Sequence, residues 1–261
     1  MKFGCCISKI DDLIRVKAAG YVFFEFAGCT AAAMSESEFD ALCAEQARTG
    51  LPCIGFNAYS AGIPAIIGHN VSDSATASYA ELLCRRGKRL GISALGIGSP
   101  NARRLPADMD KSDADAQFMR FIRIAAGAAK DHGMCVLVEA VHSGMCNYLN
   151  GTLDAAEITR LIGLDNVGMV LDFYHMAEMG EDYSLAAAAA PYLRHVHFST
   201  SGSGLWRGFP QKADFDEYRG IFAILKSIGY DGTVSIEPSE FEPEQASSCL
   251  ELLKRLEAEI K

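Results

Sequence analysis

No C-x-x-C pair occurs among the nine cysteines of the 261-residue sequence. An odd number of cysteines without this spacing is typical neither of a disulfide framework nor of a structural thiolate zinc site. We therefore expect reduced, mostly buried thiols. The sequence also has no apolar run near the ~18 residues of a membrane helix, and its start, MKFGCCISKI, is not typical of a secretory signal. These absences indicate a protein of the cytoplasm.

Positive charge is scarce, because 24 Lys and Arg residues are outnumbered by 33 Asp and Glu residues, for a formal net charge of −9. This balance disfavours a nucleic-acid partner, which requires a basic groove. The dinucleotide-binding motif G-x-G-x-x-G is also missing, since GIGSPN at 96–101 has only its first two glycines. The remaining composition, 49% hydrophobic and 22% charged, is that of an ordinary globular protein. A chain of this length needs only one domain, over residues 1–261.

Short apolar runs recur along the whole chain. Most are apolar at consecutive positions, as expected of strands in a parallel sheet that is covered on both faces. They are FGCCI (3–7), YVFFEF (21–26), LPCIGF (51–56), ISALGI (92–97), MCVLVE (134–139), VGMVLD (167–172), LRHVHF (193–198) and TVSIEP (233–238).

Helical stretches separate these runs. Residues 35–50 open with a serine cap and Glu38 three positions later, and they close on Gly50. Residues 115–133 and 214–229 also end at a glycine, after a last turn that carries a lysine. Eight strand and helix units without a linker predict an α/β fold, a closed (β/α)₈ TIM barrel, rather than an open sheet.

Ligand-type residues stand at the ends of the last four predicted strands: Glu139, Asp172, His197 and Glu237. In a parallel barrel these ends meet at one rim, where catalytic residues lie. Three carboxylates at close range would repel one another unless a cation joined them. Oxygen ligands with one imidazole suit one divalent ion, with Mn²⁺ our first choice and Mg²⁺, Co²⁺ or Zn²⁺ as alternatives. Taken singly, each residue could instead be a helix cap, a rim carboxylate paired with arginine, or a packed histidine.

Two histidines of the run at 193–198 compete for the ligand role. His195 and His197 are two positions apart and therefore point to the same face of the strand. The second lies nearer the rim, so we assign His197 to the ion and interpret His195 as a packed strand histidine.

At these residues the chain resembles the xylose isomerase-like TIM-barrel superfamily, in particular its sugar isomerase and epimerase branch, which includes ketose 3-epimerases and hydroxypyruvate isomerases. The resemblance spans nearly the whole chain. It is strongest in LVEAVHSGMCNYLNGT (137–152), LDFYHM (171–176), HVHFST (195–200) and IGYDGTVSIEP (228–238).

The resemblance implies that the four strand-end residues hold the ion and that His175 binds a substrate oxygen. It also implies that Glu139 and Glu237 act as the two bases that take up and return a proton, and that the protein forms a dimer or tetramer. Two positions depart from the ketose 3-epimerases. Met145 replaces a glutamate that contacts substrate, and Ser203 replaces an arginine, with Arg207 following a little later.

The chemistry expected of such a site is isomerisation or epimerisation of a small ketose, aldose or related hydroxy-carbonyl compound through an enediolate. Candidate substrate contacts are His175, Glu25 at the end of the second strand, Asn57, His69, Ser99, Trp206 as an apolar wall, and Arg207. Arg103 and Arg104 are interpreted as surface residues.

Three other functions remain open. An inosose-type dehydratase would share the barrel, the ion and the first proton abstraction. A zinc-dependent abasic-site endonuclease would need more ligands than six histidines and this charge suggest. A barrel that binds a sugar without turning it over would not need two matched bases.

Overall fold

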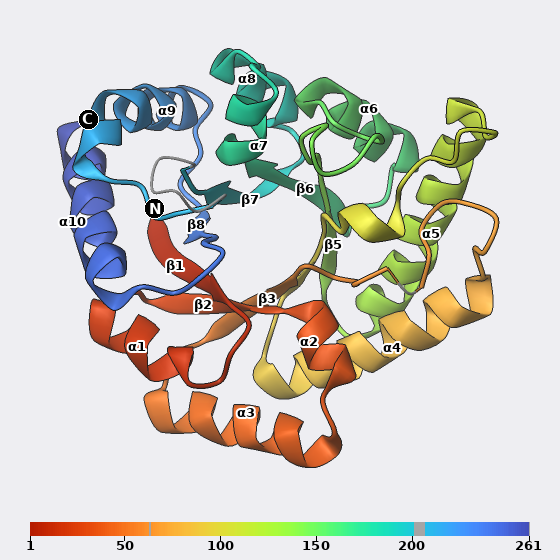
Figure 1. Cartoon of the computed structure of the whole chain (residues 1–261), viewed down its shortest axis with the longest axis horizontal. Coiled ribbons are helices and arrows are strands. Elements are labelled where there is room, and N and C mark those ends of the chain that lie inside the picture. Colours follow the sequence, from red (N-terminus) through yellow and green to blue (C-terminus); the bar gives the residue numbers. More distant parts are fainter. Residues whose placement is uncertain (63, 201–206, 261) are drawn as a thin grey trace.

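A computed structural model describes residues 1–62, 64–200 and 207–260 of the chain. Eight parallel strands form a closed barrel in which each strand pairs with the next and β8 pairs with β1 (Figure 1). The predicted (β/α)₈ fold is therefore confirmed. The strands are β1 (Lys2–Ile7), β2 (Phe23–Ala27), β3 (Cys53–Asn57), β4 (Ala94–Ile97), β5 (Cys135–Glu139), β6 (Val167–Asp172), β7 (Leu193–Phe198) and β8 (Thr233–Ile236).

Helices surround the barrel as an outer ring (Figure 1). They are α1 (Asp12–Ala19), α2 (Gly28–Ala33), α3 (Glu36–Thr49), α4 (Asp73–Leu90), α5 (Lys111–Asp131), α6 (Thr152–Ile162), α7 (Phe173–Glu178), α8 (Ala186–Ala189), α9 (Phe215–Ser227) and α10 (Pro243–Glu259). Short 3₁₀ turns occur at Pro100–Ala102, Tyr183–Leu185 and Lys212–Asp214.

The predicted helix boundaries agree with the structure to within a few residues. Ser35 and Glu38 form the expected capping box at the start of α3, and Gly50 adopts a left-handed conformation at its end, with φ of 63°. Helix α5 begins at Lys111, four residues before the predicted start at Asp115, because Asp110 in extended conformation already precedes the first turn. The nine cysteines are free thiols, as expected.

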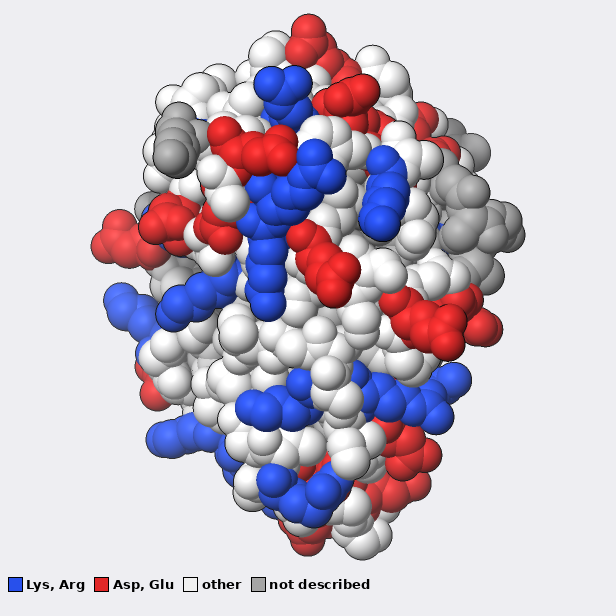
Figure 2. Space-filling view, turned by 90° about the vertical axis from the view of Figure 1, so that its left-hand side faces the viewer, with Lys and Arg blue, Asp and Glu red and all other residues white. Residues whose placement is uncertain are grey.

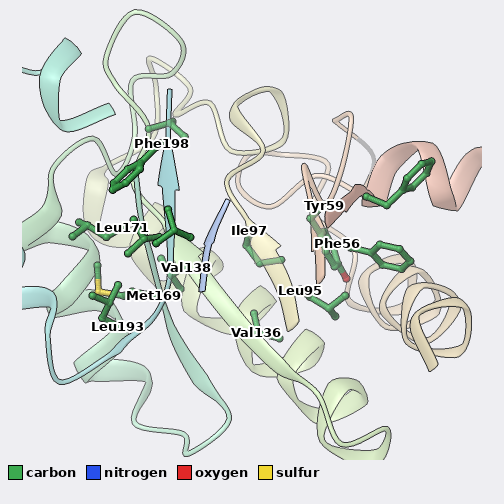
Figure 3. Packing of buried hydrophobic residues seen from close by; sticks show 14 of the residues in the cluster. Phe56, Tyr59, Leu95, Ile97, Val136, Val138, Met169, Leu171, Leu193 and Phe198 are labelled. Atoms are coloured by element: carbon green, nitrogen blue, oxygen red, sulfur yellow. The ribbon is translucent and has the colours of Figure 1, made fainter. Parts of the chain in front are cut away.

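Alternation along the strands divides the side chains between two environments. Leu95 and Ile97 on β4 and Val136 and Val138 on β5 are buried in the apolar layer between barrel and helices (Figure 3). The residues between and beyond them face the barrel interior. Glu139 follows Val138 and therefore points inward, at the end of its strand. The same parity turns Asp172 of β6, His197 of β7 and Glu237, which directly follows β8, towards the barrel axis.

The surface shown in Figure 2 carries acidic and basic side chains interspersed, without a broad basic patch on that face among the described residues. Within the described part of the chain, no helix combines the length and the apolar character that crossing a bilayer requires.

Candidate active site

A cavity of about 310 Å³ opens at the end of the barrel where the strands finish and the loops begin. Glu139 and Glu237 border it directly, while Asp172 and His197 lie more deeply buried beside them. Asn57 at the end of β3 and the loops after β1, β3, β4 and β5 supply much of the wall, the loops including Ser8, Ser60, Ser99 and Met145. The location agrees with the rim at which catalytic groups of such barrels gather.

The four strand-end residues predicted as ligands come together at this rim. Each of Glu139, Asp172, His197 and Glu237 offers one ligand atom, and these atoms lie within 4.8 Å of one another. The Nδ1 atom of His197 is 3.2 Å from Oε1 of Glu139 and 3.3 Å from Oε2 of Glu237. Asp172 and His197 are also direct neighbours across the β6–β7 ladder.

The guanidinium of Arg207 lies among these carboxylates. Its Nη2 atom donates to Oδ2 of Asp172 and to Oε2 of Glu237, both at 2.5 Å. Its Nε atom donates to the backbone carbonyl of Glu237 at 3.0 Å. Arg207 thus supplies positive charge to a buried group of acids that would otherwise repel one another.

The two glutamates have different proton affinities. Burial raises the pKa of Glu139, and contact with His197 offsets only part of this effect. Burial also acts on Glu237, but the positive charges of Arg207 and His197 outweigh it and lower the pKa of Glu237 to about 2. For His197, burial lowers the pKa, yet the carboxylate of Glu25, with Cys6 and Glu237 adding to its effect, raises it well above the ordinary value. The cluster therefore holds one carboxylate that ionises easily beside one that keeps its proton longer.

Neighbouring groups fix the orientation of each acid. The side-chain amide of Asn57 donates to Oε1 of Glu237 at 2.9 Å. The backbone N–H of Tyr174 donates to Oδ1 of Asp172 at 2.8 Å, which makes Asp172 the N-cap of α7. Gly98 leaves room for Glu139, because a Cβ atom there would lie 2.0 Å from Oε2.

His175 lines the cavity from the first turn of α7, next to the carboxylate cluster. Its Nε2 atom is 3.2 Å from Nη1 of Arg207 and 3.6 Å from Oδ2 of Asp172. Burial is the main reason why the pKa of His175 falls to about 4. The imidazole is therefore neutral near pH 7 and presents a polar edge to the cavity.

Two expected substrate contacts lie outside the cavity. Glu25 is two residues before the end of β2, so its carboxylate lies inside the barrel, where it contacts His195 and His197. His69 is on an exposed loop, with 63% of its side chain accessible, and its Nε2 atom is 3.1 Å from Asp108. The loop after β3 contributes Ser60 to the cavity wall, but His69, further along it, is not among the lining residues. Trp206 and Ser203 lie outside the described residues.

Sequence reasoning missed the role of Arg103, which was expected at the surface but has an exposed fraction of 0%. Its Nη1 atom donates to the backbone carbonyl of Glu139 at 2.8 Å, so it holds the end of β5. Burial lowers the pKa of Arg103. The neighbouring Arg104 is exposed, as expected, and donates to the carbonyl of Met145.

The donor set fits a divalent ion. Three carboxylates and one imidazole nitrogen converge, and no thiolate belongs to the group. This combination suits Mn²⁺, Mg²⁺, Co²⁺ or Zn²⁺ rather than a structural zinc site of cysteines. A cation would also provide the charge that the clustered acids require, which Arg207 provides here.

Several known proteins resemble this chain in sequence. Residues 13–256 match the family model described as xylose isomerase-like TIM barrel. An inosose isomerase from Halalkalibacterium halodurans is 30% identical over 145 residues, which are 51% of this chain and 49% of that protein. A ketose 3-epimerase from Arthrobacter globiformis is 36% identical over 114 residues, which are 43% of this chain and 37% of that protein. The chain thus spans about half the length, or less, of the curated relatives it matches.

Solved structures resemble the fold over the whole chain. The 3-keto-D-glucoside 4-epimerase from E. coli superimposes with a TM-score of 0.75 at 20% identity, covering 99% of both chains. A D-psicose 3-epimerase from Clostridium cellulolyticum H10, solved with D-tagatose, gives a TM-score of 0.73 at 18% identity, covering 100% of this chain and 96% of that one. At these identities the likeness supports the barrel alone.

Proposed function

This chain belongs to the xylose isomerase-like TIM barrel family, and on that premise we propose that it is a divalent-metal-dependent isomerase or epimerase of a small sugar or related hydroxy-carbonyl compound. The observation that carries the proposal is the convergence of Glu139, Asp172, His197 and Glu237 beside a cavity of about 310 Å³. A sugar-binding protein without turnover would not need two glutamates that border the same cavity.

In the proposed mechanism, Glu139, Asp172, His197 and Glu237 hold one divalent ion, with Mn²⁺ as the first candidate. When bound, such an ion polarises the substrate carbonyl and stabilises the negative charge that develops when the adjacent carbon loses its proton.

The glutamates move the proton. Glu139 and Glu237 border the same cavity, so one can remove a proton from the carbon beside the carbonyl and the other can return one. Return to the opposite face of that carbon inverts the centre, whereas return to the neighbouring carbon interconverts aldose and ketose. Asn57 orients the carboxylate of Glu237, and Arg103 holds the strand end that carries Glu139.

The remaining polar wall binds the substrate. His175 and Arg207 lie beside the cluster and can contact substrate oxygens, and Ser99 and Asn57 also line the cavity. Ser99 is itself positioned by the backbone N–H of Ser60, which donates to its hydroxyl at 2.8 Å. These groups are neutral or cationic hydrogen-bonding partners, as a polyhydroxylated substrate requires.

A second candidate activity is dehydration of a keto-inositol, which shares the first proton abstraction and then expels a neighbouring hydroxyl group. The similarity to inosose isomerases favours cyclic polyols among the substrates to be tested. Assays of keto-inositols against ketohexoses and short hydroxy-carbonyl compounds, with product analysis by NMR, separate isomerisation, epimerisation and dehydration.

Removal of divalent ions is expected to abolish turnover. The reason is that the carbon acid must ionise beside a polarised carbonyl, which the side chains alone polarise only weakly. Protein depleted with EDTA and dialysed should regain activity on addition of Mn²⁺, with Mg²⁺, Co²⁺ and Zn²⁺ compared at equal concentration. Circular dichroism provides the control for retained fold. Full turnover of ion-depleted protein would contradict the proposal.

Met145 is expected to disfavour ketohexoses as substrates for C3 epimerisation. Met145 lines the cavity, and the resemblance to ketose 3-epimerases implies a glutamate at this position in those enzymes, so one hydrogen-bonding partner for the substrate is missing here. We expect C3 epimerisation of fructose or tagatose to be at least about 10-fold less efficient than reaction of the preferred substrate. Initial rates across a panel of ketoses and aldoses measure this ratio. Efficient C3 epimerisation by the unmodified protein would refute it.

A further inference from the structure

Glu25 lies inside the barrel, on the far side of His197 from the carboxylate cluster. One imidazole nitrogen of His197, Nδ1, faces Glu139 and Glu237, and the other, Nε2, is 3.1 Å from Oε1 of Glu25. The same oxygen is 2.7 Å from Nε2 of His195. Glu25 is buried, with an exposed fraction of 5%, and its carboxylate is hydrogen-bonded by these two histidines and by the thiol of Cys6.

The position of Glu25 argues against a direct contact with substrate. Glu25 does not line the cavity, whereas Cys6, its neighbour across the β1–β2 ladder, does. The thiol of Cys6 is 3.6 Å from Oε1 of Glu25 and 4.0 Å from Nε2 of His197. Cys6 and the imidazole of His197 therefore pack against Glu25 on the side that faces the cluster.

We propose that Glu25 is a positioning residue that turns His197 towards the ion, an inference that rests on the proposed function. By accepting a hydrogen bond from Nε2–H, the carboxylate fixes the plane of the ring and leaves Nδ1 as the nitrogen available to the ion. A carboxylate partner of this kind also makes the coordinating nitrogen a stronger donor.

His195 completes the arrangement as the anchor of Glu25. Its Nδ1 atom is 2.7 Å from the hydroxyl of Thr233, which can donate to it, so Nε2 carries the proton that Glu25 accepts. Gly55 leaves space beside Glu25, because a Cβ atom there would lie 3.2 Å from Oε2. The hydrogen bonds thus join β8, β7 and β2 and end on the ligand His197.

The substitution Glu25→Gln tests the role of the carboxylate. Glutamine keeps the shape of glutamate but accepts a weaker hydrogen bond from His197. We expect the Kd for Mn²⁺, measured by calorimetry on ion-depleted protein, to rise by about 10-fold to 100-fold. At saturating Mn²⁺ the KM for substrate should stay close to that of the unmodified protein.

A matched control is Phe24→Leu, which changes a buried residue of the same strand that faces the outer apolar layer. This variant should lower the thermal stability of the ion-free protein but leave the Kd for Mn²⁺ unchanged. His195→Gln is a second test, because it keeps Glu25 and removes its anchor. We expect it to weaken Mn²⁺ binding in the same direction and to a smaller extent.

The outcomes separate this inference from the proposed function. If Glu25→Gln and His195→Gln both bind Mn²⁺ as tightly as the unmodified protein, the positioning role is wrong while the metal site stands. A raised KM with unchanged Mn²⁺ affinity would make Glu25 a substrate contact instead. If the unmodified protein binds no divalent ion at all, the proposed function itself fails, together with the inference.

Discussion

Replacing Glu237 by glutamine is expected to lower turnover by about 10²-fold or more, with only partial loss of the ion. Glutamine keeps the shape of the side chain and one oxygen that can still coordinate, but it cannot accept a proton from carbon. Asn57 and Arg207 hold the carboxylate in place in the unmodified protein, so the change removes a base that is already oriented. Glu139→Gln, the matched change on the other side of the cluster, should lower turnover in the same way.

Solvent exchange gives this prediction a second measurement. If the two glutamates are the bases, turnover in D₂O should place deuterium on the carbon beside the substrate carbonyl, because a carboxylate exchanges its proton with water. A hydride shift between carbons would introduce no such label. Metal content must be measured with each rate. A fully metallated Glu237→Gln protein with near-normal turnover and label exchange would show that Glu237 serves as a ligand only.

The second large effect is expected at Asp172 rather than at His175, although the two side chains are adjacent. Asp172→Asn should weaken divalent-ion binding by about 10²-fold or more, because an anionic ligand becomes a neutral amide. Loss of a direct ligand lowers metal affinity more than loss of a residue that only hydrogen-bonds to a ligand. His175→Ala should keep the ion and instead raise KM or lower turnover, since His175 lines the cavity beside the cluster.

Calorimetric titration of both ion-depleted variants with Mn²⁺ distinguishes these roles. Thermal unfolding without the ion is the control, because Asp172 also caps α7 through the backbone N–H of Tyr174. Equal loss of Mn²⁺ affinity in the two variants would show that His175 is a ligand and not a substrate contact.

The regular recurrence of apolar strands and helices along the chain allowed both the barrel and the ligand cluster to be predicted from the sequence. In a parallel barrel every strand points the same way, so the last inward residue of each strand reaches one rim whatever the loops do. Glu139, Asp172 and His197 each stand within two residues of the end of their strands, and Glu237 directly follows β8. Their convergence therefore follows from strand order and parity alone.

The errors arose where a contact depends on depth or on a loop path. The sequence predicts Glu25 at the end of its strand, but β2 continues to Ala27, which places the carboxylate one layer deeper. Parity assigns Glu25 to the inner face, because it alternates with the outward-facing Phe24 and Phe26, but its depth depends on where the strand ends. No comparable signal exists for His69 or Arg103. Whether such a loop residue turns inward is decided by long-range partners, here Asp108 and the carbonyl of Glu139.

The four ligand-type residues of the site all come from the second half of the chain. The four clustered groups come from the strands β5 to β8, whereas Ser8, Ser60 and Ser99 of the cavity wall come from the loops of the first half. On the proposed function, part of the substrate-binding wall is thus encoded by a different stretch of sequence from the four clustered groups, and the two stretches meet only after the barrel closes. A first half from a relative could therefore alter substrate preference without changing the reactive centre. It would have to retain Asn57 and Glu25, which reach across to Glu237 and His197.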